Sequence, residues 1–444
     1  MCGACGELRL DGRVPDVSAV AAMAETMVDR GPDGAGVWSA GRVALGHRRL
    51  KIIDLSEAGA QPMVDPELGL AIAWNGCIYN YPMLRAELSS HGYRFFSHSD
   101  TEVLIKAYHH WGDRFVDHLA GMFAFAIVER DSGRVLLGRD RLGIKPLYLS
   151  EDAHRVRFAS SLPALLDGGD VDTRIDPTAL HHYLSFHSVV PPPRTILRGV
   201  TKVPPATLIA FEPDGRRIQT TYWSPDFRRR DEHADWSERD WEEAILGSLR
   251  VAVQRRLVAD VPVGALLSGG VDSSAVVAMM AGQSEGPVNT CSIAFDDPAF
   301  NEAEFAQTVA NRYHTNHRVE TVKSDDFDLI DTLARLYDEP YADSSAIPTY
   351  RVCQLARKRV TVALSGDGGD EALGGYRRYR MHLMEERMRS ALPAGLRQPL
   401  FGLLGRVYPK ADWAPRVLRA KTTFEGMARN EVEAYFHSMS LVRE

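Results

Sequence analysis

The chain has 444 residues, of which 45% are hydrophobic and 25% are charged, so it is long enough for two or three globular domains. The formal net charge is −7 and no long basic stretch occurs, so no nucleic-acid partner is expected. No apolar run approaches the roughly 20 residues that a transmembrane helix needs, and the N-terminus lacks a signal-peptide pattern. We therefore expect a soluble, cytoplasmic protein with no membrane partner.

The chain begins Met-Cys-Gly, and Cys2 is the first candidate catalytic residue. Removal of Met1 would leave Cys2 with a free α-amine beside its thiol. An α-amine titrates near neutral pH, so it can accept the thiol proton and generate a nucleophilic thiolate. The alternative is a small residue that happens to be cysteine. The cysteines are odd in number, so they do not predict a disulfide framework.

From residue 1 to about 213, short β-rich segments alternate with turns, which predicts packed antiparallel sheets. Amphipathic helices are expected near residues 17–27 and 101–111. The candidate strands are 43–46, 70–74, 123–128, 135–137 and 156–158. Residues 214–235 are polar and charged, and we expect them to form a linker.

From residue 236 the pattern changes to short apolar strands that alternate with helices. Ser237 and Asp240 resemble a capping box that opens a helix. Strands are predicted at 263–267, 290–295, 318–322 and 360–364, and helices at 273–281, 303–313, 327–337 and 346–356. This alternation is typical of a doubly wound α/β domain with a mostly parallel sheet, which we place at residues 236–444.

The first strand of this second half runs into Ser-Gly-Gly-Val-Asp-Ser-Ser at 268–274 and then a helix. Two glycines allow a sharp turn that brings backbone N–H groups close to a ligand, and the helix N-terminus favours an anion. Asp272 stands among these donors, where it can hold Mg²⁺ bound to phosphate oxygens. The pattern matches the loop of ATP pyrophosphatases, and a plain glycine-serine turn is the alternative. A second loop, 365–371, interleaves acids with glycines after another apolar strand, which favours a metal or an amine.

With these residues the chain resembles the glutamine-dependent asparagine synthetases, which join an N-terminal cysteine glutaminase to an ATP-pyrophosphatase domain. The resemblance is carried through nearly the whole chain by Cys2-Gly3, 30–33, 46–50, Asn75-Gly76, 99–102, 121–125, 139–148 and the two loops above. It implies an α+β sandwich of the N-terminal-nucleophile hydrolase type over residues 1–213, followed by the α/β domain.

The resemblance implies a role for each matched residue of the glutaminase half. Cys2 would attack the side-chain amide of glutamine, and Asn75 with the N–H of Gly76 would form the oxyanion hole. Arg49 would hold the α-carboxylate, and Asp100 would hold the α-amino group. The other expected glutamine-binding residues are Ile52, Ile53 and Cys77, of which Cys77 stands where asparagine synthetases have glutamate. Without the resemblance, a surface charge at Arg49 and a hairpin turn at Asn75 are the simpler interpretations.

In the second half the resemblance implies an ATP site and a Mg²⁺ site. Asp272 and Asp370 would bind Mg²⁺–pyrophosphate, and Asp367 is the candidate on the acceptor side. The ATP-binding candidates are Leu266, Ser268, Gly269, Gly270, Asp272, Ser273, Ile293, Ser365 and Gly366. The expected cofactors are ATP and Mg²⁺. The expected partners are glutamine, ATP and a small carboxylate acceptor, and a homodimer is a candidate assembly.

Departures from the family pattern leave the acceptor open. The segment 343–348 lacks the arginine that asparagine synthetases tend to have before Pro348, and Asp367 replaces a glutamate. The run 75–80 looks like the branch that amidates N-acetylglutaminylglutamine, found with related enzymes in exopolysaccharide gene clusters. Aspartate is the first expected acceptor and such a dipeptide is the alternative. Family members also continue past the position of Glu444, so we expect an incomplete synthetase domain. A non-synthesising binding or regulatory protein is the third hypothesis.

Overall fold

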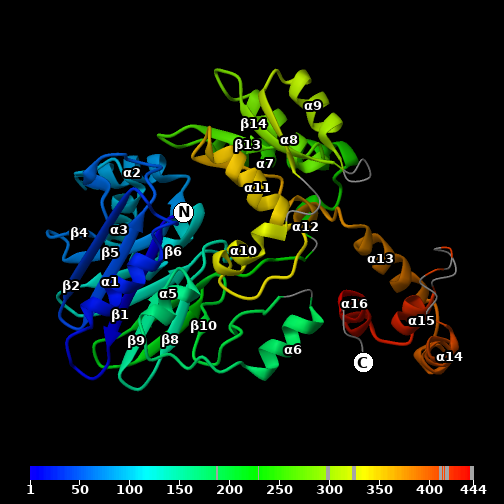
Figure 1. Cartoon of the computed structure of the whole chain (residues 1–444), viewed down its shortest axis with the longest axis horizontal. Helices are drawn as coiled ribbons and strands as arrows, with labels where there is room; N and C mark the ends of the chain where they lie inside the picture. The colour runs from blue at the N-terminus through cyan, green and yellow to red at the C-terminus, as the bar shows by residue number, and fades with distance from the viewer. Residues whose placement is uncertain are drawn as a thin grey trace.

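The computed structural model describes residues 1–186, 189–228, 230–296, 301–322, 327–409, 413, 415 and 420–440. Figure 1 shows three parts: a β-rich N-terminal half, a second half built around a smaller sheet, and a helical arm at the C-terminal end. No helix among these described residues is long and apolar enough to cross a membrane.

The N-terminal half contains two six-stranded antiparallel sheets. The first has the order β10 (Thr201–Lys202), β8 (Tyr148–Glu151), β9 (Arg155–Ala159), β1 (Gly3–Arg9), β3 (Val43–Arg49) and β2 (Gly34–Ala40). The second has the order β12 (Arg217–Thr221), β11 (Thr207–Phe211), β7 (Val135–Arg139), β6 (Gly121–Glu129), β5 (Leu70–Ile78) and β4 (Met63–Asp65). The predicted antiparallel sheets are therefore confirmed.

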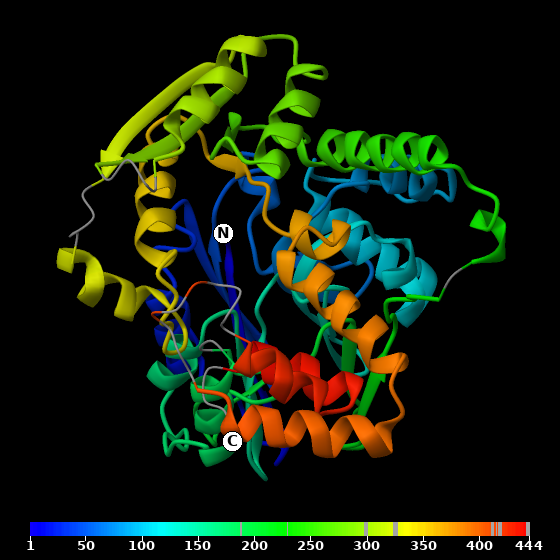
Figure 2. The same ribbon diagram turned by 90° about the vertical axis from the view of Figure 1, so that its right-hand side faces the viewer.

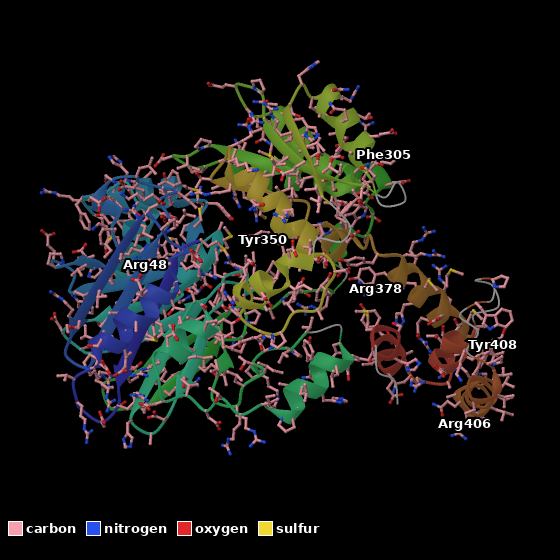
Figure 3. All side chains as sticks on the ribbon, in the orientation of Figure 1. Arg48, Phe305, Tyr350, Arg378, Arg406 and Tyr408 are labelled. Carbon is pink, nitrogen blue, oxygen red and sulfur yellow. The ribbon has the colours of Figure 1, made fainter. Side chains whose placement is uncertain are left out.

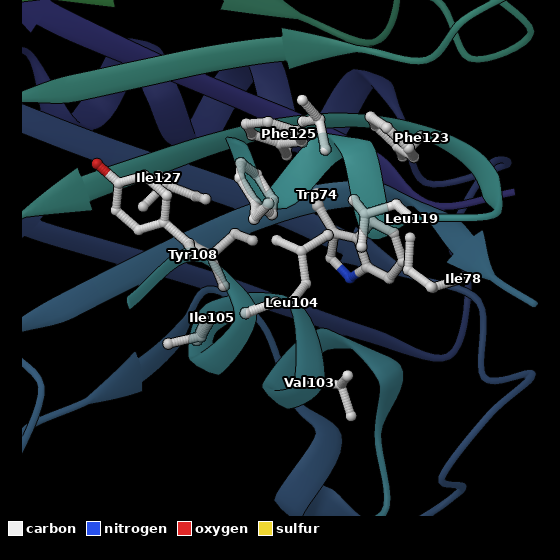
Figure 4. Packing of buried hydrophobic residues seen from close by; sticks show 14 of the residues in the cluster. Trp74, Ile78, Val103, Leu104, Ile105, Tyr108, Leu119, Phe123, Phe125 and Ile127 are labelled. Carbon is white, nitrogen blue, oxygen red and sulfur yellow. The ribbon is translucent and has the colours of Figure 1, made fainter. Parts of the chain in front are cut away.

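Helices cover the outer faces of both sheets, so the central strands are buried on two sides. The helices α1 (Val17–Thr26) and α5 (Leu162–Asp167) pack on the first sheet, and α2 (Tyr81–Ser90) and α3 (Asp100–Trp111) pack on the second. Figure 4 shows Trp74, Phe123 and Phe125 of the second sheet against Leu104 and Tyr108 of α3. A separate core of mostly small and β-branched side chains lies between the two sheets. The result is a four-layer sandwich.

The second half has one four-stranded sheet in which every strand is parallel. Its order is β15 (Asn316–Val322), β14 (Asn289–Phe295), β13 (Val263–Leu266) and β16 (Val362–Leu364). The helices of this half are α7 (Glu238–Arg256), α8 (Val271–Ala281), α9 (Ala303–Arg312), α10 (Ile330–Leu336) and α11 (Ala346–Arg357). The strand order reverses between β13 and β16, which is the topological switch point where α/β sheets bind ligands. The predicted doubly wound α/β fold is confirmed.

The C-terminal arm consists of helices that pack mainly on one another, as Figure 2 shows for the orange and red segments. They are α13 (Arg377–Ser390), α14 (Ala394–Val407), α15 (Lys421–Met427) and α16 (Glu431–Met439), preceded by the short α12 (Gly369–Leu373). The buried guanidinium of Arg397 on α14 donates to the carbonyl oxygens of Met427 and Arg429. In the described part of the chain the remaining helices are α4 (Phe115–His118), α6 (Pro177–Ser185) and the 3-10 turns Glu57–Gly59, Gly112–Arg114, Asp231–His233 and Phe327–Leu329.

Two local expectations differ from the structure. Residues 217–221, expected in a linker, form β12, which pairs with β11. Every residue of β12 is exposed, so this edge strand has the polar composition of a linker. Asn75 lies inside β5 and pairs with Ala124 of β6, so the hairpin-turn interpretation is wrong. The capping box at Ser237 and Asp240 is confirmed at the start of α7.

Candidate active site

Cys2 immediately precedes β1, in the sheet that faces β5. Its Sγ accepts a hydrogen bond from the backbone N–H of Leu50 at 3.3 Å, while Arg30 Nε donates to its carbonyl oxygen at 3.3 Å. Burial raises the pKa of the Cys2 thiol. Burial also lowers the pKa of the Met1 α-amine to about 6, so this amine is largely a free base at neutral pH. A thiol that is hard to ionise thus lies beside a ready proton acceptor.

Asn75 faces the same space from β5. Side chains alternate along a strand, and Trp74 and Ile78 point into the core under α3, so Asn75 and Cys77 point toward the first sheet. Asn75 is 1% exposed, and its Nδ2 has no hydrogen-bond partner among the described residues. A side chain at Gly76 would lie 2.4 Å from the Trp74 ring. The crowding at Gly76 thus lies on the α3 side of β5, whereas the buried and unpartnered amide of Asn75, on the other side, fits an oxyanion hole.

Arg49 is the last residue of β3, and it is buried rather than a surface charge, being 5% exposed. Its guanidinium donates to the carbonyl oxygens of Ser56, at 2.8 Å, and of Asp54. It therefore fixes the loop that contains Ile52 and Ile53, which the sequence analysis assigned to the glutamine pocket. Arg49 and the loop are thus in direct contact, and the binding of glutamine by Arg49 stays a prediction.

Asp100 opens α3 and is buried, with its carboxylate accepting the Ile78 N–H at 3.0 Å. Burial raises the pKa of Asp100 to about 7. Cys77 lies next in the chain to Ile78, and burial together with the charge of Asp100 raises the pKa of its thiol. An ammonium group placed beside Asp100 would favour the ionised carboxylate, which agrees with the expected α-amino contact.

The loop 268–274 leaves β13 at the switch point and enters α8. Gly269 has φ +88°, and a side chain there would lie 2.6 Å from the Ala306 N of α9. The exposed Phe305, labelled in Figure 3, borders this glycine. Ser268 Oγ lies 3.0 Å from Ser273 Oγ and accepts the Gly270 N–H at 3.3 Å. The loop is compact and presents the start of a helix at its open end.

The second loop, 365–371, leaves β16 and contacts the first loop. A side chain at Gly366 would lie 2.6 Å from the backbone nitrogen of Ser273. Ser365 Oγ donates to Asp367 at 2.7 Å. Leu266 ends β13 and Ile293 lies near the end of β14. The structure thus brings every expected ATP-binding residue to the carboxyl edge of one sheet.

Asp272 and Asp370, one from each nucleotide loop, are the expected Mg²⁺ ligands. A side chain at Gly369 would lie 2.5 Å from Cγ of Asp272, so glycine leaves the room that this carboxylate occupies. The described residues contain no cluster of three or more histidine, cysteine or acidic ligands. Mg²⁺ in phosphate sites usually takes one or two carboxylates and completes its shell with phosphates and water. A pair of carboxylates suits that arrangement.

Comparison with known proteins identifies the family. The model of the glutamine amidotransferase domain matches residues 1–223, and that of the asparagine synthase domain matches residues 244–442. The chain is 36% identical over 406 residues to glutamine-hydrolysing asparagine synthetase 1 of Bacillus subtilis, covering 91% of this chain and 61% of that protein. The chain belongs to the glutamine-hydrolysing asparagine synthetase family.

Other members of this family are similar to a comparable degree. A Methanocaldococcus jannaschii protein, assigned as a second asparagine synthetase, is 36% identical over 85% of this chain and 76% of its own length. Asparagine synthetase 3 of B. subtilis is 32% identical, covering 85% of this chain and 63% of that protein. The chain thus spans less than two thirds of both B. subtilis relatives. A solved B. subtilis glutamine phosphoribosylpyrophosphate amidotransferase covers 72% of this chain and 65% of its own at 16% identity, with a TM-score of 0.39.

Two further residues lie beside Met1 and Cys2, and the sequence alone gave neither of them a role. Lys145 is 4% exposed, and its Nζ lies 3.0 Å from Sδ of Met1, directly beside Cys2. Arg30 contacts the Cys2 carbonyl, as described above. Both residues belong to sequence runs that carry the family resemblance, 30–33 and 139–148, so the runs themselves were the available signal.

Proposed function

We propose that the chain is a glutamine-hydrolysing, ATP-dependent amidotransferase of the asparagine synthetase type, with Mg²⁺ as cofactor. The observation that carries the proposal is that one chain contains two candidate sites. One combines Cys2, which precedes β1, with the unpartnered Asn75 amide of β5, on the face directed toward the first sheet. The other is a pair of glycine-rich loops at the switch point of a parallel sheet. The first suits ammonia release, and the second suits ATP cleavage between the α and β phosphates.

In the glutaminase half, the α-amine of processed Cys2 takes the thiol proton, and the thiolate attacks the carboxamide carbon of glutamine. The Asn75 amide and the Gly76 N–H stabilise the negative oxygen that develops. Ammonia leaves, a γ-glutamyl thioester remains on Cys2, and water hydrolyses it to glutamate. Arg49 and Asp100 hold the α-carboxylate and α-amino group, which fixes the substrate for attack.

In the synthetase half, the acceptor carboxylate attacks the α-phosphate of ATP, diphosphate leaves, and ammonia then displaces AMP from the acyl-adenylate. The loop 268–274 would hold phosphate oxygens through its N–H groups and hydroxyls. Asp272 and Asp370 would hold Mg²⁺, which neutralises the charge of the diphosphate. The carboxyl-edge residues Leu266 and Ile293 would contact the nucleotide. A homodimer remains a prediction.

The glutaminase assignment is tested by a glutamine-analogue diazoketone, which alkylates the attacking thiolate. Mass spectrometry after treatment should find one label, on Cys2, and the Cys2→Ala variant should stay unlabelled. Cys353 is the exposed cysteine among the five and serves as an internal control for indiscriminate alkylation. A label elsewhere, or none on the processed protein, contradicts the assignment.

Aspartate is the first acceptor to test, because the family match is to asparagine synthetases. A second acceptor, N-acetylglutaminylglutamine, is favoured by Asp367 and by the segment 343–348. Asp343 Oδ1 accepts the Ser345 N–H at 2.8 Å at the start of α11, where no arginine precedes Pro348. AMP release with each compound separates the two acceptors. AMP release with neither of them supports a protein that hydrolyses glutamine without synthesis.

A further inference from the structure

Asp260, a residue of the second half, contacts two residues of the loop 52–54, which belongs to the expected glutamine pocket. The Asp260 N–H donates to the carbonyl oxygen of Ile52 at 2.9 Å. Its carboxylate accepts the Asp54 N–H at 2.8 Å. These bonds join residues that are about two hundred positions apart in the chain. Asp260 therefore holds residues 52–54 from outside the glutaminase half.

The loop 52–54, which Asp260 contacts, includes a residue in an unfavourable backbone conformation. Asp54 has φ +56°, in the left-handed region that a non-glycine residue adopts at a cost. The carboxylate of Asp54 accepts the His98 N–H at 2.9 Å. Burial alone would raise the pKa of Asp54, but hydrogen bonds from Ser56 and His98 lower the pKa below its ordinary value. The guanidinium of Arg49 donates to the Asp54 carbonyl. A shift of Asp54 would thus move the cation that is proposed to bind glutamine.

Asp260 is connected to the nucleotide loops through the strands β13 and β16. Asp260 lies three positions before β13, whose carboxyl end carries the loop 268–274. Two residues after Asp260, the carbonyl oxygen of Pro262 accepts the Thr361 N–H at 3.1 Å, at the start of β16. The segment 256–262, from the end of α7 to the start of β13, is therefore joined to both strands that carry the nucleotide loops.

A second contact places the same segment against the glutaminase half. The guanidinium of Arg256, the last residue of α7, lies over the ring of Tyr79 at 4.8 Å from its centre. Tyr79 follows β5 directly, so it lies one residue beyond the strand that carries Asn75 and Cys77. The segment 256–262 thus contacts both the loop 52–54 and the residue that follows β5.

We propose that Asp260 is a positioning residue that couples the nucleotide loops to the glutamine pocket. MgATP at the switch point restrains β13, β16 and the segment 256–262, and this restrains residues 52–54 and Arg49 in the conformation that binds glutamine. Affinity for glutamine therefore rises when the nucleotide site is filled, and by linkage glutamine raises the affinity for MgATP. The inference rests on the proposed function and adds regulation of the same site.

The test measures glutaminase KM and kcat of the full chain with and without MgATP. We expect MgATP to lower the KM of the unmodified chain about threefold or more. Asp260→Ala leaves the Asp54 N–H without its acceptor, a loss that typically changes an equilibrium about fivefold or more. The KM should rise by that factor, kcat should stay within about twofold, and MgATP should no longer change the KM. Asp260→Asn keeps an acceptor oxygen and should restore both values.

A matched control separates coupling from a general effect on the contact between the halves. Glu339 also accepts a backbone N–H from the glutaminase half, that of Ile196, at 2.8 Å, but far from residues 52–54 in the chain. Glu339→Ala should leave the KM for glutamine and its response to MgATP unchanged. The proposal is overturned if Asp260→Ala keeps the original KM, if Glu339→Ala behaves like it, or if MgATP has no effect on the unmodified chain. A processed chain that hydrolyses no glutamine overturns the proposed function and this inference with it.

Discussion

The Asn75 side chain is buried, yet its amide nitrogen bonds to nothing among the described residues. An unsatisfied buried donor costs free energy of folding, so removing it should not destabilise the protein. Removing an oxyanion donor typically lowers kcat about 10²–10³-fold. We therefore expect Asn75→Ala to lose glutaminase activity by that factor with no fall in Tm. A clear fall in Tm together with a modest loss of activity would show that Asn75 has a structural role instead.

Asp100 gives the glutamine pocket a pH dependence. With a pKa of about 7, its carboxylate is mostly protonated at pH 6 and mostly ionised at pH 8. Only the ionised form attracts the α-ammonium group, so the Kd for glutamine should be about tenfold higher at pH 6. Calorimetric titration of Cys2→Ala, which cannot turn over, measures this directly. Asp100→Asn should bind more weakly at both values and lose the dependence on pH.

The same shift affects stability. Because the folded-state pKa of Asp100 lies above that of an unfolded chain, the folded state binds more protons between about pH 4 and 7. This residue therefore makes the protein less stable as the pH rises through that window, and the destabilisation is complete above pH 7. Thermal unfolding at pH 8 should show a higher Tm for Asp100→Asn than for the unmodified chain. A lower Tm for Asp100→Asn would mean that the hydrogen bond from the Ile78 N–H stabilises the fold only when the Asp100 carboxylate is ionised.

At the residue scale, the sequence identified chemistry better than geometry. Cys2, Asn75 and Asp100 were expected from matched motifs, and in the structure the Asn75 and Asp100 side chains are buried. The two hydrogen bonds of Asp260 to the loop 52–54 were not predictable, because they join distant positions through backbone groups. Backbone donors leave no signature in residue type, so only coordinates reveal such contacts.

At the scale of elements, the two nucleotide loops can approach each other closely because the second loop has glycines where the two meet. A side chain at Gly366 would lie 2.6 Å from the Ser273 backbone nitrogen at the start of α8, a contact that backbone cannot easily relieve. Gly366→Ala should therefore reduce AMP formation by about tenfold or more and leave glutamine hydrolysis without ATP unchanged. Gly282→Ala, at the other end of α8, is the matched control, since its added carbon would meet its nearest atom at 3.7 Å.

The strands of the second half and its helices up to Arg357 were predicted, because most of these strands are short, apolar and followed by turn residues, whereas the helices of the C-terminal arm were not predicted. The strands at the sheet edges were harder to recognise. β2 and β12 lie at the ends of the two antiparallel sheets, where one side of the strand has no neighbour. In β2 the burial alternates, and in β12 every residue is exposed. Hydrophobic patterning follows burial, which explains why β2 and β12 were not predicted. The buried strands β1 and β11 were not predicted either, so burial accounts for only part of the missed strands.

At the scale of the whole molecule, several contacts between the halves are made by acids of the second half. Asp338 Oδ1 accepts the Ser161 hydroxyl at 2.9 Å and the Leu162 N–H at 3.3 Å. Glu339 bonds to the Ile196 N–H and pairs with Lys202. These acids lie more than a hundred positions from their partners, and nothing local in the sequence predicts them. They make the unfolding of one half depend on the other.

The double variant Asp338→Ala, Glu339→Ala tests this dependence by scanning calorimetry. Each backbone donor left without its acceptor costs about 1–3 kcal/mol, and the cost falls on the contact between the halves rather than on either core. We expect the thermal transitions of the two halves to move apart, with the less stable half unfolding at a lower temperature. Glu243→Ala removes the exposed pair with Arg239 inside α7, which contributes little, and should leave the scan unchanged. If the double variant unfolds like the unmodified chain, these contacts do not link the two halves.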